Sequence, residues 1–262
     1  MSHSLFASEP HPAGPKSHVA PAWHILQLEA QRMAQAEPLL RALMYTSILC
    51  HDRFEAALAR LLACKLCEPE LPAEVLNTLF LDVFEQTPSI AAAAISDLYA
   101  SVNRDPATEE IVQPFLYHKG FHALQSHRVT HRLWNDGRRA LACLIQSRTS
   151  EIFAIDIHPA AQLGCGLLMD HGTGVVIGET SIVGDDVTIF QGVTLGGTGK
   201  QSGDRHPKVG AEVLLCANAT VLGNIQIGRG AKIGAGSVVL EDVPAWSTYV
   251  GMAARAVVRI ID

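Results

Sequence analysis

The sequence contains little charge and no excess of positive charge. Only 18% of its 262 residues are charged, with 20 Lys and Arg against 26 Asp and Glu, for a formal net charge of −6. Nucleic-acid binding needs clustered Lys and Arg, and no such stripe, interleaved with aromatic residues, occurs here. The hydrophobic content of 48% excludes global disorder. We therefore expect a folded protein without a nucleic-acid partner.

Long apolar runs and cysteine patterns are also missing. No run reaches the length of roughly 20 residues that a membrane-spanning helix needs, which predicts no membrane partner. Residues 1–20 are rich in Ser, His and Pro and lack the features of a secretory signal, so we expect a disordered tail. The spacing Cys64 to Cys67 lacks a second pair, and no metal site is predicted. The scattered cysteines favour reduced thiols and a cytoplasmic location; they stand at positions 50, 64, 67, 143, 165 and 216.

Residues 21–150 have the pattern of a helical domain. Ala, Leu, Glu, Gln and Arg dominate, and apolar residues recur every three or four positions, as in Leu58, Leu61, Leu62 and Leu66. Prolines such as Pro38 and Pro88 interrupt the pattern, because proline lacks the amide hydrogen of a helix interior. Several helices of ordinary length are predicted.

Residues 151–262 follow a different period, in which an aliphatic residue returns at every sixth position. A six-residue unit cannot bury its own apolar side, so such units stack into a solenoid with a continuous core, here a β-helix. The predicted inward positions form three registers: Ile157, Leu163, Met169, Val175; Ile177, Val183, Ile189, Leu195; and Val209, Leu215, Val221, Ile227, Ile233, Val239.

The period is interrupted between Leu195 and Val209. The gap of fourteen residues is two more than two hexads would use, and it predicts a loop over residues 196–208 that leaves the solenoid. Polar loops held by rigid scaffolds often carry binding groups, although a tolerated surface insertion is the alternative. The loop lacks the spacing and context of a phosphate-binding motif for ATP or NAD.

Several motifs occur in a fixed order: DIHPAA from Asp156, MDHGTG from Met169, GGTGK from Gly196 and GDRHPK from Gly203, with KGFHAL from Lys119 before them. With these motifs the chain resembles the serine O-acetyltransferases of the hexapeptide-repeat acyltransferase superfamily. The resemblance implies an α+β protein with a helical N-terminal domain followed by a left-handed parallel β-helix. It also implies transfer of acetyl from acetyl-CoA to the hydroxyl of L-serine, giving O-acetyl-L-serine and CoA, the first step of cysteine biosynthesis from serine.

Acetylation of an alcohol requires a base, because the hydroxyl is a poor nucleophile until its proton is removed. Histidine suits this task near neutral pH. His171 is the candidate general base, and Asp156, fifteen residues earlier and about one coil away, is the candidate partner that orients the imidazole. The resemblance implies the same catalytic pair. A structural role in a strand is the alternative for a lone histidine.

The resemblance assigns further residues to the two substrates. Serine is a zwitterion, so its pocket needs anionic groups for the ammonium and donors for the carboxylate. Asp105 and Asp170 match the first role, while Arg205 and His206 match the second. For Asp105 the alternative is a helix boundary before Pro106, and for the loop residues it is simple solvation. The matching acetyl-CoA contacts are Gly197, Ala217 and Lys232. Acetyl-CoA would be a co-substrate, with no tightly bound cofactor.

Assembly and regulation follow from the same resemblance. The site would form between β-helices of a homotrimer, and the helical domains would join two trimers into a homohexamer. L-cysteine would act as a feedback inhibitor. Family members often end in an isoleucine that enters the active site of O-acetylserine sulfhydrylase, but here the last residue is Asp262, which argues against that partnership.

Three other functions are compatible with hexapeptide repeats. An acyltransferase for a sugar, an antibiotic or homoserine would keep His171 but would not need the zwitterion pocket. A metal enzyme similar to the γ-class carbonic anhydrases would need a His-x4-His pair, which the sequence lacks. A silent scaffold would be expected to lose the base or the loop. The joint presence of all six predicted residues favours serine acetylation.

Overall fold

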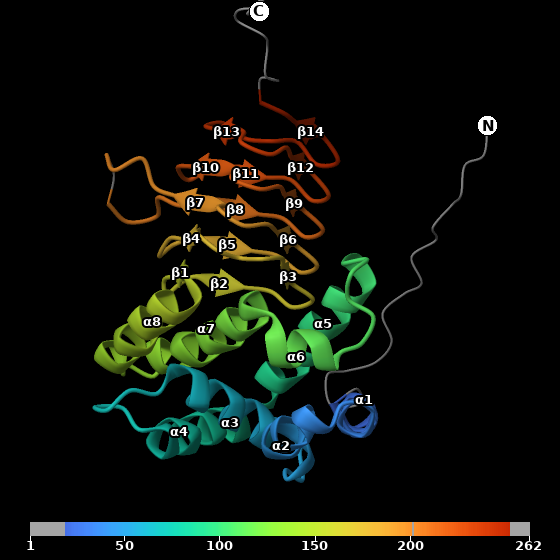
Figure 1. Ribbon diagram of the computed structural model, residues 1–262. Coiled ribbons are helices and arrows are strands. Elements are labelled where there is room, and N and C mark those ends of the chain that lie inside the picture. Colours follow the sequence, from blue (N-terminus) through green and yellow to red (C-terminus); the bar gives the residue numbers. More distant parts are fainter. Residues whose placement is uncertain (1–18, 201, 252–262) are drawn as a thin grey trace, which may run out of the picture.

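The computed structural model describes residues 19–200 and 202–251, and it consists of a helical part followed by a solenoid of short strands (Figure 1). The helix α1 begins at Val19, two residues before the predicted start, and the rest of the predicted tail, like the C-terminal residue Asp262, lies outside the described residues. The helical elements are α1 Val19–Ala36, η1 Pro38–Leu40, α2 Arg41–Met44, η2 Tyr45–Leu49, α3 Phe54–Leu66, α4 Ala73–Gln86, α5 Pro88–Arg104, α6 Val112–Tyr117, α7 Lys119–Asn135 and α8 Arg139–Phe153.

The helical part ends three residues later than the sequence pattern predicts. Helix α8 continues to Phe153, and Ala154 then turns the chain with a positive φ of 56°. A left-handed residue at this position is a common way to end a helix. The first strand follows at once, at Ile155. None of the helices in the described ranges is long and apolar enough to cross a membrane.

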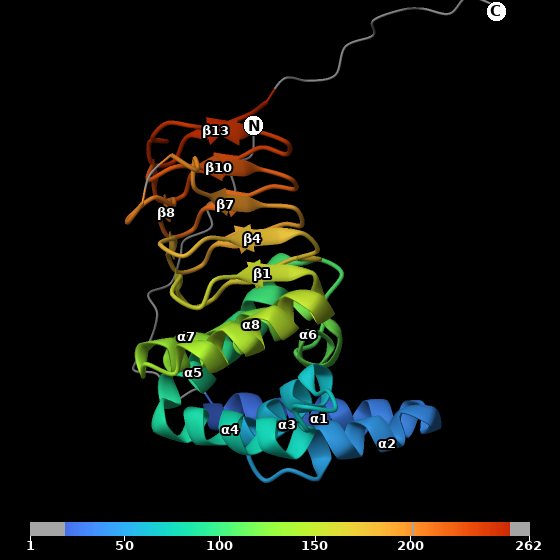
Figure 2. The same cartoon turned by 90° about the vertical axis from the view of Figure 1, so that its left-hand side faces the viewer.

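The strands form three parallel sheets that run the length of the solenoid. Their orders are β1-β4-β7-β10-β13, β11-β8-β5-β2 and β14-β12-β9-β6-β3. Figure 2 shows the first sheet with its strands stacked one above the other. The strands are β1 Ile155–Ile157, β2 Gln162–Leu163, β3 Leu168–Met169, β4 Val175–Ile177, β5 Ile182–Val183, β6 Thr188–Ile189, β7 Thr194–Gly196, β8 Lys208–Val209, β9 Leu214–Leu215, β10 Thr220–Leu222, β11 Gln226–Ile227, β12 Lys232–Ile233, β13 Val238–Val239 and β14 Thr248–Tyr249.

The register of the sheets confirms the hexad pattern and corrects it at two places. The first correction concerns Val175, which pairs with Ile155, whereas Ile177 pairs with Ile157 as the next inward residue in the column. Both Val175 and Ile177 are buried. The chain between β3 and β4 therefore holds two residues more than a regular hexad, and the sequence pattern counted them as part of the repeat.

The second correction concerns the length of the loop. Leu195 and Val209 lie on the successive strands β7 and β8. Matching residues of successive strands are six apart at regular corners, as between Val183 and Ile189, but fourteen apart here. Eight extra residues are therefore inserted at one corner, whereas the sequence pattern predicted two extra residues added to two hexads. Figure 1 shows this loop projecting beside β7. The reason for the error is that one long insertion and two hexads of irregular sequence have almost the same length.

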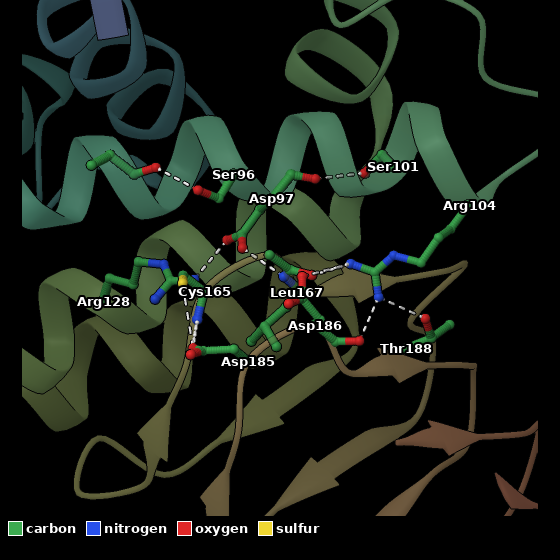
Figure 3. A network of polar contacts seen from close by, with 12 residues as sticks. Ser96, Asp97, Ser101, Arg104, Arg128, Cys165, Leu167, Asp185, Asp186 and Thr188 are labelled. Atoms are coloured by element: carbon green, nitrogen blue, oxygen red, sulfur yellow. Dashed lines mark hydrogen bonds and ion pairs between the residues drawn. The ribbon is translucent and has the colours of Figure 1, made fainter. Parts of the chain in front are cut away.

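The two parts of the chain are joined by a buried ionic network (Figure 3). Asp97 of α5 is 1% exposed, and its carboxylate accepts hydrogen bonds from Gln125 at 2.9 Å and Arg128 at 2.7 Å, both on α7. The other oxygen accepts from the backbone of Leu167, in the first coil, at 2.8 Å. Nearby, Arg104 donates to the backbone oxygen of Asp186 at 2.7 Å. These contacts fix α5 and α7 against the base of the solenoid.

Candidate active site

His171 lies on the corner of the solenoid that the two inserted residues widen. Its φ is 56°, and Gly172 and Gly174 beside it also have positive φ values, of 72° and 78°. The left-handed region is unfavourable for residues with a Cβ, but it recurs at other corners of the solenoid, at Asp186, Glu212 and Asn218, so the tight corner imposes it. The side chain of His171 is 70% exposed. The insertion thus presents this imidazole to solvent and away from the core.

Two carboxylates accompany His171 at this corner. The Oδ1 atom of Asp170 lies 3.9 Å from His171 Nδ1. Asp105 ends helix α5, where its carboxylate accepts from Thr108 Oγ1 at 2.6 Å and from the backbone of Ala107 at 2.9 Å. The bond from Thr108 is the main reason that the pKa of Asp105 is lowered, and nearby His171 contributes to the same direction. Asp105 therefore stabilises a turn, as the alternative prediction held, and also lies close to His171.

The start of helix α7 packs against the same corner. A Cβ on Gly120 would lie 2.1 Å from the backbone oxygen of Met169, so only glycine allows this close approach. Lys119 Nζ donates a hydrogen bond to Thr173 Oγ1. The preceding residue, His118, is half-buried; burial lowers its pKa, against the charges of Asp105 and Asp170, which raise it. His118 was not predicted from the sequence, because only the fold places the end of α5 beside the start of α7.

Arg205 and His206 lie together in the loop between β7 and β8, where they contact the corner that follows β4. Arg205 Nη2 donates to Glu179 Oε2 at 2.7 Å, and its Nη1 donates to the backbone oxygen of Gly203 at 3.0 Å. The bond from Arg205 lowers the pKa of Glu179. His206 is 7% exposed and contacts Thr180, and burial is the main cause that lowers its pKa. Glu179 and Thr180 were not predicted either, although they directly precede β5, in the corner over which the loop lies.

Asp156 projects from β1, on the face between these two corners. Its Oδ1 atom accepts a hydrogen bond from the amide of Gln146 on α8. Among the described residues no ion pair within 4 Å joins Asp156 to His171. Their pairing therefore stays a prediction.

The three predicted acetyl-CoA residues divide between the two corners. A Cβ on Gly197 would lie 3.5 Å from atoms of both Arg205 and His206, so this residue belongs to the second corner. Ala217 lies in the corner column of His171, where its oxygen accepts from Gly236 at 2.9 Å. Lys232 is exposed on β12, the strand that enters the same column.

Within one chain, the predicted residues therefore form two clusters at opposite ends of β4. We call Asp105, His118, Asp170 and His171 the base cluster, and Glu179, Thr180, Arg205 and His206 the loop cluster. A cavity of about 840 Å³ lies elsewhere, between α5, α7 and the corner after β2, and none of the predicted residues lines it. Over residues 19–200 and 202–251, no group of three His, Cys, Asp or Glu side chains has the arrangement of a metal site.

The parallel solenoid and its exposed histidine define a hexapeptide-repeat transferase, and residues 206–241 match the family model "Bacterial transferase hexapeptide (six repeats)". Residues 22–126 match the model "Serine acetyltransferase, N-terminal". The chain is 48% identical over 235 residues to the serine acetyltransferase of Salmonella typhimurium, covering 90% of this chain and 86% of the relative. The chain belongs to the serine acetyltransferase family. The predicted fold and the predicted acyltransferase class are confirmed.

Solved structures of relatives superpose on most of the chain. The soybean serine acetyltransferase complexed with serine has a TM-score of 0.88 at 50% identity, covering 92% of this chain and 99% of that one. The serine acetyltransferase of Brucella abortus in complex with coenzyme A has a TM-score of 0.87 at 47% identity, covering 90% and 95%. A serine acetyltransferase complex with cysteine has a TM-score of 0.87 at 48% identity, covering 92% and 94%.

Proposed function

We propose that this chain transfers acetyl from acetyl-CoA to the hydroxyl of L-serine, with His171 as the general base. The convergence of Asp105, Asp170 and His171 at one corner carries the proposal, because Asp105 comes from the helical part of the chain and the other two come from the solenoid. Two carboxylates beside an exposed imidazole fit a substrate that has an ammonium group next to a reacting hydroxyl.

The proposed reaction forms one bond and breaks one. The serine oxygen attacks the thioester carbonyl while the imidazole of His171 takes the hydroxyl proton, and the tetrahedral intermediate then expels the CoA thiolate. The imidazolium returns the proton to that sulfur. Asp105 and Asp170 bind the ammonium and place the hydroxyl near the base. Asp156, whose Oδ1 atom accepts from Gln146, is proposed to orient His171.

The carboxylate of serine would be bound by Arg205 and His206 from a second copy of the chain. The base cluster and the loop cluster lie at opposite ends of β4, so one chain alone does not bring them together. A homotrimer with its β-helices side by side would place one chain's loop cluster beside its neighbour's base cluster. The same contact would bring Gly197 of one copy near Ala217 and Lys232 of another, completing a groove for acetyl-CoA. A dimer of such trimers is the larger assembly proposed.

The remaining partners are also proposals. L-cysteine would inhibit by occupying the serine site, since it differs from serine only in the sulfur atom. Binding to O-acetylserine sulfhydrylase is not part of the proposal. The sequence prediction against it concerns Asp262, which lies outside the described residues. The cytoplasmic location stays a prediction from cysteine spacing.

The experiment is thiol release from acetyl-CoA on addition of L-serine, with L-homoserine as the control acceptor. We expect wild type to release CoA with serine, and His171→Ala to lose about 10²–10⁴-fold in kcat, which is the usual contribution of a general base. Circular dichroism and size-exclusion chromatography should show the variant folded and assembled, because the side chain is largely exposed. Turnover of homoserine without turnover of serine would refute the proposed substrate, and a fully active variant would refute the proposed base.

A further inference from the structure

Thr180 occupies the centre of the loop cluster. Its hydroxyl oxygen lies 3.0 Å from the backbone nitrogen of Arg205 and 3.1 Å from that of His206. The same hydroxyl lies 2.9 Å from His206 Nδ1, and the backbone nitrogen of Thr180 lies 3.2 Å from that atom. One residue in the corner between β4 and β5 thus contacts the backbone and the ring of a loop residue 26 positions later.

The hydrogen-bond roles at this contact are constrained. Backbone N–H groups only donate, so the Thr180 oxygen accepts from Arg205 and His206, and His206 Nδ1 accepts from the Thr180 backbone. The Thr180 hydroxyl has one hydrogen to donate. The two groups near enough to accept it are His206 Nδ1 and the Asp204 carboxylate. Since Nδ1 accepts a hydrogen bond from the Thr180 backbone, it carries no proton, and the ring proton lies on the other nitrogen, Nε2.

The Nε2 edge of the ring faces two glycines. A Cβ on Gly178 would lie 2.2 Å from Nε2, and one on Gly197 would lie 3.5 Å from it. The ring therefore packs directly against the backbone of Gly178, and the side from which an oxygen of a bound molecule can approach Nε2 is that of Gly197, where a Cβ would meet no atom closer than 3.5 Å. The opposite tautomer would present a lone pair at the same place and would repel an anionic oxygen.

We propose that Thr180 is a positioning residue that holds His206 in the tautomer with Nε2 protonated, so that His206 donates to the substrate carboxylate. This inference rests on the proposed function, which places serine beside His206. Arg205 is positioned by the same hydroxyl through its backbone, and by Glu179 through its guanidinium. Thr180 itself does not touch the substrate.

The test compares Thr180→Val, which removes the hydroxyl at nearly constant shape, with Thr180→Ser, which keeps it. The first measurement is the ¹⁵N spectrum of the His206 ring in the full-length protein, assigned with His206→Gln. Wild type and Thr180→Ser should show Nδ1 unprotonated and Nε2 protonated. Thr180→Val keeps the backbone N–H that donates to Nδ1 but loses the hydroxyl, so it should show the same tautomer with a shifted Nδ1 signal. The second measurement is KM for serine, which should rise about tenfold in Thr180→Val, corresponding to a hydrogen-bond network worth roughly 1.4 kcal/mol.

The control is Thr220→Val, on the neighbouring face of the solenoid in strand β10, which should leave both readouts as in wild type. A wild-type spectrum with Nδ1 protonated would overturn the inference, and this result does not depend on how any Thr180 variant folds. So would Thr180→Val with an unchanged spectrum and an unchanged KM. Absence of serine turnover in wild type would instead refute the proposed function, while the spectrum would still report whether Thr180 sets the tautomer.

Discussion

Acidification from pH 7.5 to 5.5 should destabilise the fold through two buried histidines of α7. His122 and His127 are 1% and 3% exposed, and burial lowers the pKa of each to about 3. The Nε2 atom of each ring faces a backbone oxygen, of Phe115 at 2.8 Å and of Ala161 at 3.1 Å. Both rings therefore stay neutral in the folded state over this pH range.

The sign of the effect follows from proton binding. An unfolded histidine has a pKa near 6.5, so between that value and about 3 the unfolded state binds a proton that the folded state does not. Stability is unaffected by these rings above pH 6.5 and falls as the pH decreases below it. From pH 7.5 to 5.5 each ring should cost about 1.4 kcal/mol, or roughly 2.7 kcal/mol for both.

The assay is urea unfolding at both pH values and at one protein concentration, because the stability of an oligomer depends on concentration. His127→Gln keeps a donor for Ala161 but cannot titrate, so its stability difference between the two pH values should be smaller than that of wild type by about 1.4 kcal/mol. A pH-independent cost of the substitution cancels in this comparison. His24→Gln changes the same atoms on an exposed side chain and serves as the control. Equal pH dependence in wild type and His127→Gln would refute the reasoning.

Two further predictions concern the joint between the two parts of the chain and the shared site. Asp97→Ala should reduce the free energy of unfolding by about 3–5 kcal/mol, because it leaves the buried guanidinium of Arg128 unpaired. Glu85→Ala, which breaks the exposed pair with Arg53, should cost less than about 1 kcal/mol, and equal losses in urea unfolding would contradict this reasoning. Co-expressed His171→Ala and Arg205→Ala chains should regain serine acetylation that neither variant has alone, because a mixed trimer contains one intact site. No recovery of activity in purified mixed trimers would exclude a site shared between copies.

The positions of the candidate residues show where sequence patterns are insufficient. The hexads predicted the solenoid, but not that the corner of His171 contains two extra residues, because Val175 and Ile177 are both aliphatic and both buried. The loop was predicted at the right place with the wrong number of inserted residues. Asp105 could be linked to the site only through resemblance, since 65 residues separate it from Asp170 and no period connects helix and strand.

The sequence by itself determined the local structure and the class of fold. A period of six with inward aliphatic residues has one stable arrangement, in which each coil buries its apolar side against the next, and a period of three to four favours helices. The motifs were enough to indicate the family and the candidate residues.

Only the tertiary structure decided which of these residues lie together. The end of α5 and the start of α7 meet the corner of His171 because Asp97 and Arg128 fix both helices against the first coil. The bond from Leu167 to Asp97 joins segments 70 residues apart. His171 of the base cluster and Glu179 of the loop cluster are close in sequence yet lie at opposite ends of β4, because a strand in a solenoid separates its two corners. Distances of this kind follow from packing between remote segments, which no local pattern records.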